Sequence, residues 1–77
     1  MTRQKESCTI KITTDFIKLD SALKMANLVG SGGEAKILIA DGEAAVNGET
    51  EVRRGRKLYP GDHVQIGDYD LNVEKEL

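Results

Sequence analysis

The second half of this 77-residue chain is divided by turn signals into segments too short for helices. Asn47-Gly48 is the strongest two-residue hairpin signal, and Pro60-Gly61 suits the central positions of a type II turn. Gly67-Asp68 forms a further tight turn, and the stretch HVQI at 63–66 alternates polar and apolar residues as a strand does. We therefore expect everything after Gly42 to form short strands of a small, twisted antiparallel sheet.

The first half predicts one strand and then a helix. The stretch CTIKIT at 8–13 alternates apolar with polar residues, which is the pattern of a half-buried strand. The helix is predicted from apolar residues at positions i, i+3, i+4 and i+7, namely Leu19, Ala22, Leu23 and Ala26. Thr14 or Asp15 is expected to cap its start, and Gly30 is a stop signal.

A second helix is predicted directly after the first. Ser31 lies three residues before Glu34, which is the capping-box spacing at a helix start. Gly42 stands where a left-handed residue ends a helix. The inward positions of this helix are expected to be Ala35, Leu38 and Ile39, with Ile37 beside them. The connection between the two helices is only a few residues long, so they should pack as a pair and give an α+β fold.

Size and composition narrow the possible functions. A chain this short is expected to form one small domain over residues 1–77, with the first six residues fraying. One Cys and one His exclude a four-ligand zinc site within one chain, and we expect neither a cofactor nor a small-molecule substrate. The sequence contains no nucleophile–base pair at a recognisable spacing, so we do not expect an enzyme.

The sequence also bears on the compartment. No stretch approaches the ~20 apolar residues of a membrane span, and the start lacks the apolar run of a signal peptide. We therefore expect a cytoplasmic protein without membrane contact.

Positive charge is concentrated in one segment of an otherwise acidic chain. The formal net charge is −2, yet Gly55 is surrounded by Arg53, Arg54, Arg56 and Lys57. Arg offers a planar fork that matches phosphate oxygens, and Lys adds a mobile point charge. The residues alone leave two interpretations open, an anion-binding loop and a solvated loop that keeps a small protein soluble. Lys24 is interpreted as an ordinary solvated helix lysine.

A longer pattern of motifs runs from Lys18 to Gly48. It consists of Lys18-Leu19-Asp20, Ser31, Ala35, Leu38-Ile39, Gly42 and Val46-Asn47-Gly48, and Gly61-Asp62 follows before an alternating strand. With this spacing the span from Phe16 to Ile66, about two thirds of the chain, resembles the RNA-binding domain first named for the fourth protein of the small ribosomal subunit, here called the S-four domain. The stretches SGGEAK and RRGRKLYPGD further resemble small stand-alone bacterial proteins of the YaaA type.

The resemblance implies a fold and a site. Members of the family share a helix pair plus hairpin, the αL-type motif, which docks on structured RNA, and catalysis in the family comes from fused domains. The residues that we expect to contact RNA are Lys18, Lys36 and Asn47 from the family pattern, Ser31, Gly32 and Gly33 at a helix start whose free N–H groups can bind a phosphate, and Arg53, Arg54, Arg56 and Lys57 from the basic segment. The chain departs from the family at Gly32, where Arg is usual, and at Ala40 and Asp41, where basic residues are common. Only Lys36 remains charged on this helix face, and the basic segment could compensate.

We therefore expect a non-catalytic protein that binds structured RNA, such as ribosomal RNA, a tRNA-like fold or another stem-loop, in ribosome assembly or translation. Phosphate contacts carry little sequence information, and Tyr59 and Tyr69 fit strand packing as well as base stacking, so low sequence specificity is expected. Reversing the charge of both Arg53 and Arg54 to Glu is expected to abolish binding without unfolding the domain. The alternative is an interaction module that docks an acidic protein on the ribosome or on a nucleic-acid enzyme. The protein is expected to be a monomer.

Overall fold

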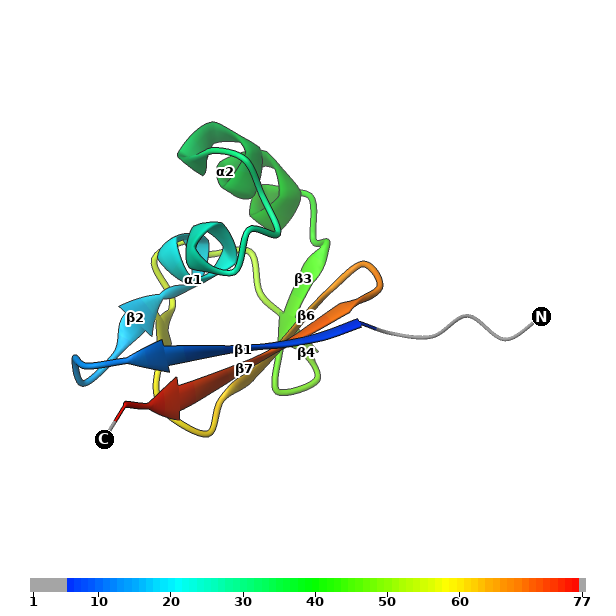
Figure 1. Cartoon of the computed structure of the whole chain (residues 1–77). Coiled ribbons are helices and arrows are strands. Elements are labelled where there is room, and N and C mark those ends of the chain that lie inside the picture. The colour runs from blue at the N-terminus through cyan, green and yellow to red at the C-terminus, as the bar shows by residue number, and fades with distance from the viewer. Residues whose placement is uncertain (1–5, 77) are drawn as a thin grey trace.

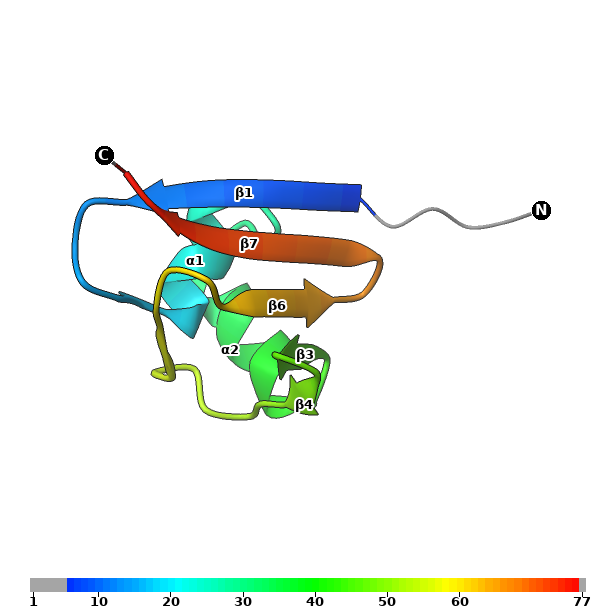
Figure 2. The same cartoon turned by 90° about the horizontal axis from the view of Figure 1, so that it is seen from below.

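The computed structural model describes residues 6–76, which form two helices, a five-stranded sheet and a two-stranded sheet. Along the chain the elements are β1 (Glu6–Ile12), β2 (Ile17–Lys18), α1 (Leu19–Met25), α2 (Gly32–Ala40), β3 (Ala44–Val46), β4 (Glu49–Thr50), β5 (Lys57–Leu58), β6 (His63–Ile66) and β7 (Tyr69–Lys75). The larger sheet has the order β1-β7-β6-β3-β4, and the smaller one pairs β2 with β5. Both helices lie on the same side of the larger sheet (Figure 1, Figure 2).

The α+β class is confirmed, but the larger sheet is mixed where an antiparallel one was expected. Three of its strand pairs are antiparallel, whereas β1 and β7 run parallel, with Glu6 opposite Tyr69 and Ile12 opposite Lys75. A parallel pair needs a long crossover between its strands. Here the helices and the hairpins between β1 and β7 supply that crossover. The first and last strands therefore lie side by side (Figure 2).

The core lies between the two helices and the face of the larger sheet that they cover. Alternate strand residues point into it, such as Val64 and Ile66 on β6, which confirms the predicted alternation of that strand. The largest fully buried side chains are Leu19, Leu23, Ile39, Leu58, Leu71, Val46, Val64 and Val73. Burying one such side chain contributes roughly 1.5–3 kcal/mol, so a small number of well-packed residues holds this domain together.

The start of α1 differs from the prediction. Thr14 and Asp15 do not cap the helix, because it begins only at Leu19. The two residues before the helix pair instead with β5 as strand β2. The first N–H group of α1 donates to the carbonyl of Arg56 (2.8 Å) and the second to the carbonyl of Arg54 (3.1 Å). Carbonyls of a distant loop thus replace a side-chain cap, and local sequence does not reveal such a partner.

Both helices end at a left-handed residue that closes a Schellman motif. Asn27 (φ 58°) follows the end of α1, so the predicted stop at Gly30 lies too late in the chain. The N–H groups of Asn27 and Leu28 donate to carbonyls of the last turn of α1, at 3.0 Å each. Gly42 (φ 80°) ends α2 in the same way, which confirms its predicted role.

The buried face of α2 is narrower than the sequence predicts. Ala35 and Ile39 are buried and Leu38 is half-buried, whereas Ile37 is 62% exposed. A helix turns by ~100° per residue, so Ile37 points ~200° away from both buried positions and cannot share their face. The expectation that Ile37 lies beside the inward residues is therefore wrong.

The predicted hairpin turn and type II turn are confirmed. Asn47-Gly48 joins β3 to β4 with φ values of 51° and 88°, and positive φ at both central residues is what a type I′ turn requires. Gly61 has a φ of 98°, and the N–H of Asp62 donates to the carbonyl of Tyr59 at 2.9 Å, as in a type II turn. Of the six residues expected to fray, Glu6 begins β1 and the others lie outside the described residues.

Candidate functional site

The basic segment forms a loop, residues 53–57, that leads from β4 into β5 and lies against the start of α1. We call it the basic loop. Two of its carbonyls, those of Arg54 and Arg56, accept the first N–H groups of α1. A hydrogen bond from the N–H of Arg56 to the carbonyl of Arg53 (3.2 Å) closes the turn around Gly55. The backbone of the basic loop is therefore fixed by contacts to a helix, unlike that of a freely solvated loop.

A buried carboxylate anchors two side chains of the basic loop. Glu51 is only 6% exposed, and Arg53 donates to it from the backbone N–H (3.1 Å), Nε (3.0 Å) and Nη2 (3.0 Å). Arg56 Nη1 donates to the same carboxylate at 2.9 Å. The hydrogen bonds from Arg53 and then from Arg56 hold the pKa of Glu51 well below its usual range, while the pKa of Arg53 is raised by its hydrogen bonds to Glu51. Glu51 is therefore ionised near neutral pH and balances one charge of the loop.

Lys18 joins the basic loop from the neighbouring strand of the small sheet. It stands directly across from Lys57 in the antiparallel β2–β5 pair. Cβ atoms at such positions are ~4.5–5.5 Å apart, and like charges there are destabilising. Lys57 also lies over the ring of Phe16, with its Nζ 4.8 Å from the ring centroid. Within residues 6–76 the side chains of Lys18 and Arg54 make no hydrogen bond or ion pair, so their charges are open to a ligand.

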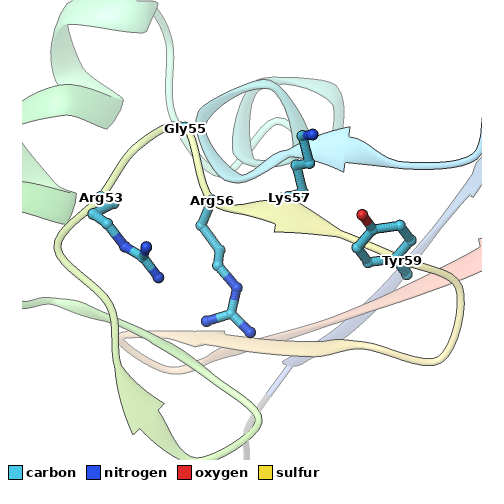
Figure 3. Close-up of a pocket in the computed structure, with 5 residues that line it drawn as sticks. All are labelled: Arg53, Gly55, Arg56, Lys57 and Tyr59. Atoms are coloured by element: carbon cyan, nitrogen blue, oxygen red, sulfur yellow. The ribbon is translucent and has the colours of Figure 1, made fainter.

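An open hollow of about 500 Å³ lies beside the basic loop. It is lined by Arg53, Gly55, Arg56, Lys57 and Tyr59 (Figure 3). The ring of Tyr59 is half-exposed and packs at a tilted angle on Phe16, with the ring centroids 6.1 Å apart. Positive charge and an aromatic face therefore meet at this place.

The predicted residues at the start of α2 form a second group, near the other end of α1. Ser31 Oγ accepts a hydrogen bond from the N–H of Glu34 at 3.2 Å, so Ser31 caps α2 as predicted. Lys24, on the last turn of α1, has its Nζ 3.9 Å from the position that a Cβ atom would take on Gly32. The two other predicted residues of α2 are exposed, namely Gly33 and Lys36. α1 is ~10 Å long, and this length separates the group from the basic loop.

Asn47 lies at a third place and links two turns. Its Nδ2 donates to Oδ1 of Asp62 at 3.1 Å, and its Oδ1 accepts from the N–H of His63 at 3.0 Å. The other carboxylate oxygen of Asp62 accepts from the N–H of Tyr59 at 2.7 Å. The side chain of Asn47 thus fixes the β3–β4 hairpin against the type II turn. The predicted site residues are therefore divided, and the largest group that lies together is the basic loop with Lys18.

Within residues 6–76, no group of three or more His, Cys, Asp or Glu side chains is placed to hold a metal ion. No helix in this part of the chain is long and apolar enough to span a membrane. Cys8 is a free thiol, half-buried on β1.

The sequence from residue 10 to residue 74 matches the family described as S4 domain. The chain belongs to the S4 domain family. This is the S-four domain that the motifs resemble, so the expected family is confirmed. A Bacillus subtilis (strain 168) protein named "Probable ribosome maturation protein RlbA" is 49% identical over 57 residues, which cover 74% of this chain and 80% of that relative. An Escherichia coli (strain K12) protein named "Putative RNA-binding protein YbcJ" is 33% identical over 57 residues, which cover 74% of this chain and 81% of that relative.

Two residues that shape the surface of this S4 domain were not predicted from the sequence. Glu51 stands two positions before Arg53, a spacing that permits pairing but does not reveal that the carboxylate is buried. Lys24 is one of several exposed lysines, and only the packing of α1 against α2 brings its ammonium to Gly32. This lysine therefore stands beside the position where the family resemblance leads us to expect Arg.

Proposed function

We propose that this S4 domain protein binds structured RNA without catalysing a reaction, and that its ligand is a ribosomal RNA stem-loop bound during ribosome assembly or translation. The basic loop and Lys18 hold the phosphates in this proposal. Lys24 and Lys36 add positive charge near the start of α2, where they can meet a more distant part of the same RNA.

The observation that carries the proposal is the juxtaposition of Lys18, Lys57 and Arg54. Lys18 and Lys57 oppose each other across a strand pair, which costs stability in the absence of a ligand. Arg54 adds a third exposed cation on the same loop. A polyanion placed between these side chains relieves their repulsion, and a phosphate backbone supplies closely spaced negative charges.

The names of two relatives support an RNA ligand and a connection to the ribosome. One relative is named a ribosome maturation protein, and another is named an RNA-binding protein. Both similarities extend over 74% of this chain, so they concern most of the domain and not one short motif.

The geometry of the basic loop suits recognition by shape. Glu51 fixes the guanidinium groups of Arg53 and Arg56 before any ligand arrives, so less conformational entropy is lost on binding. The major groove of an RNA helix is too deep and narrow for side chains to read, and proteins recognise such helices through phosphates and 2′-hydroxyls. Cations at fixed spacing therefore select the form of the RNA backbone more than its sequence.

The test is a titration of the protein with a labelled ribosomal RNA stem-loop over a range of salt concentrations, beside a DNA duplex of equal length. The affinity for RNA should exceed that for DNA and should fall with salt, with a logarithmic slope of roughly −0.7 to −0.9 per neutralised phosphate. Binding of neither nucleic acid at low salt would overturn the proposal. Capture of an acidic protein that survives nuclease treatment would then favour the interaction module.

A matched pair of variants locates the surface. Arg54→Gln and Lys11→Gln each remove one exposed positive charge, the first from the basic loop and the second from β1. Arg54→Gln should weaken RNA binding. It should also reduce the magnitude of the logarithmic salt slope by about one, because one phosphate contact is lost. Lys11→Gln should leave the slope unchanged. Equal effects of the two variants would indicate attraction by net charge and not by the basic loop.

A further inference from the structure

The hollow beside the basic loop is larger than phosphate contacts require. Its volume of about 500 Å³ lies within the ~300–1,000 Å³ of typical small-ligand sites. Its lining residues carry two guanidinium groups and one phenol ring, and they include Lys57, whose ammonium lies over the ring of Phe16. This set of groups fits a nucleotide, because a base stacks on an aromatic ring or a guanidinium plane while its phosphate pairs with cations.

Tyr59 presents its ring to this hollow in a fixed position. Tyr59 follows directly after β5 and so lies outside the strand. Its side chain is 49% exposed, which leaves part of the ring free to contact a ligand. Its backbone N–H donates to Asp62, and its ring rests on Phe16 at a tilt of 51°. The ring is therefore held from behind by another aromatic residue and is accessible from the side of the hollow.

Arg53 and Arg56 extend in the same direction from the basic loop, whereas Lys57 extends in the other direction, and Tyr59 lies further along the chain after β5 (Figure 3). Two hydrogen bonds to Glu51 fix the guanidinium plane of Arg53, and one holds the guanidinium group of Arg56 beside it. Such groups can stack on a base as well as bind phosphate. A Cβ atom added to Gly55 would meet nothing within 4 Å, so the hollow is open at this edge. An open edge leaves room for a nucleotide that is still joined to its neighbours in a chain.

We infer that the hollow accepts one unpaired nucleotide of the bound RNA, with its base on the ring of Tyr59 and its phosphate on the cations of the basic loop. The inference rests on the proposed function and adds a preference to it. A base inside a helix is stacked between its neighbours and cannot reach Tyr59, whereas a bulged base is already unstacked. The preferred ligand is therefore a stem that carries a bulged or looped-out nucleotide, and not a fully paired stem.

The experiment compares three stem-loops that differ at one position. The first is fully paired, the second carries a one-nucleotide bulge, and the third has an abasic residue in place of the bulged nucleotide. Fluorescence anisotropy at one salt concentration gives the three dissociation constants. The bulged RNA is expected to bind about tenfold more tightly than the other two, within the range measured for base stacking on aromatic side chains.

Variants of the two tyrosines assign this preference to the hollow. Tyr59→Ala should bring the affinity ratio of bulged to abasic RNA close to one, and Tyr59→Phe should keep the ratio because it keeps the ring. Tyr69 is similarly exposed but lies at the start of β7, so Tyr69→Ala is the matched control and should also keep the ratio.

An independent signal covers the case that Tyr59→Ala fails to fold. The chain has two tyrosines and no tryptophan, so in Tyr69→Phe the tyrosine emission comes from Tyr59 alone. Bulged RNA should quench this emission, and the paired and abasic RNAs at equal saturation should not. Equal quenching by all three RNAs contradicts base stacking on Tyr59.

Each outcome separates the two proposals. If the three RNAs bind equally well, or if the bulge preference survives in Tyr59→Ala, the hollow is not a nucleotide site and RNA binding by the basic loop stands. If the wild-type protein binds none of the RNAs, both proposals fail. Adenosine 5′-monophosphate serves as competitor, and a free nucleotide that binds more tightly than the bulged RNA would assign the hollow to a small molecule instead.

Discussion

Arg53 donates three hydrogen bonds to the carboxylate of Glu51, from its backbone N–H and from Nε and Nη2 of its guanidinium group. This acidic residue is buried beneath the basic loop and receives a further hydrogen bond from Arg56. The most positively charged part of the chain is thus organised around a negative charge. The consequence is a loop whose shape depends on Glu51 and whose open charges come from other residues.

Glu51→Gln should lower the free energy of unfolding by about 1–2 kcal/mol, because it replaces charge-assisted hydrogen bonds with neutral ones. Urea denaturation measures this change. Glu49→Gln is the control, since Glu49 is an exposed carboxylate on the adjacent strand β4 and its loss should have almost no effect. Equal stability of the two variants would mean that the Glu51 contacts do not stabilise the folded loop.

Stability should also fall in acid through Glu51. Its pKa is lowered in the folded protein, so the unfolded chain takes up the proton more readily. The stabilising contribution of Glu51 is therefore complete above its unfolded pKa of ~4.3 and decreases as the pH falls below that value toward the folded pKa. Thermal unfolding between pH 6 and pH 2.5 should show a steeper loss for wild type than for Glu51→Gln. Parallel curves would contradict the lowered pKa.

The two neighbouring arginines should respond differently to charge reversal. Arg53→Glu places a second carboxylate against Glu51, so it should destabilise the domain as well as weaken RNA binding. Arg54→Glu changes an exposed side chain and should weaken RNA binding while the thermal midpoint stays within a few degrees. From the sequence we expected reversal of both arginines to leave the fold intact, and the contacts to Glu51 now lead us to expect this of Arg54 but not of Arg53. Thermal unfolding and RNA titration of the two single variants test this difference.

Lys18→Glu should make the protein more stable and its RNA binding weaker. The change places a carboxylate across from Lys57 and turns a like-charge pair into an opposite-charge pair, which is worth roughly 0.2–1 kcal/mol. A negative charge at the residue before α1 is also favourable at a helix start. Chemical denaturation and RNA titration of the same sample measure both effects. Both the stability and the RNA affinity of Lys18→Gln should lie between those of wild type and Lys18→Glu. A loss of stability in Lys18→Glu would argue against repulsion between Lys18 and Lys57 in the wild type.

The fold was largely predictable because its signals are local. The hairpin at Asn47-Gly48 and the end of α2 at Gly42 depend on residues that tolerate positive φ, and such residues are visible in the sequence. The start of α1 and the parallel pairing of β1 with β7 were not predictable in this way. Both depend on partners more than thirty positions away, namely carbonyls of the basic loop and the last strand.

The candidate site was predictable as a region but not as an arrangement. The run of basic residues and the family resemblance identified the basic loop and Lys18, yet they gave all four loop cations the same role. The structure separates them, since Arg53 and Arg56 bind Glu51 whereas Arg54 has no such partner within residues 6–76. Burial of one carboxylate makes this distinction, and burial depends on packing that a short motif does not encode.

The parallel pairing of the first strand with the last bears on how the domain forms during synthesis. Glu6 of β1 pairs with Tyr69, 63 positions later in the chain. All the remaining pairs between β1 and β7 have the same separation. A contact of such high sequence separation must close almost the whole chain into a loop, which slows folding. Because β7 is the last strand of this domain to emerge from the ribosome, β1 has no strand partner until the rest of the domain has been synthesised. Truncations that end before Tyr69 should therefore leave β1 unprotected in hydrogen exchange even where the helix pair is already formed.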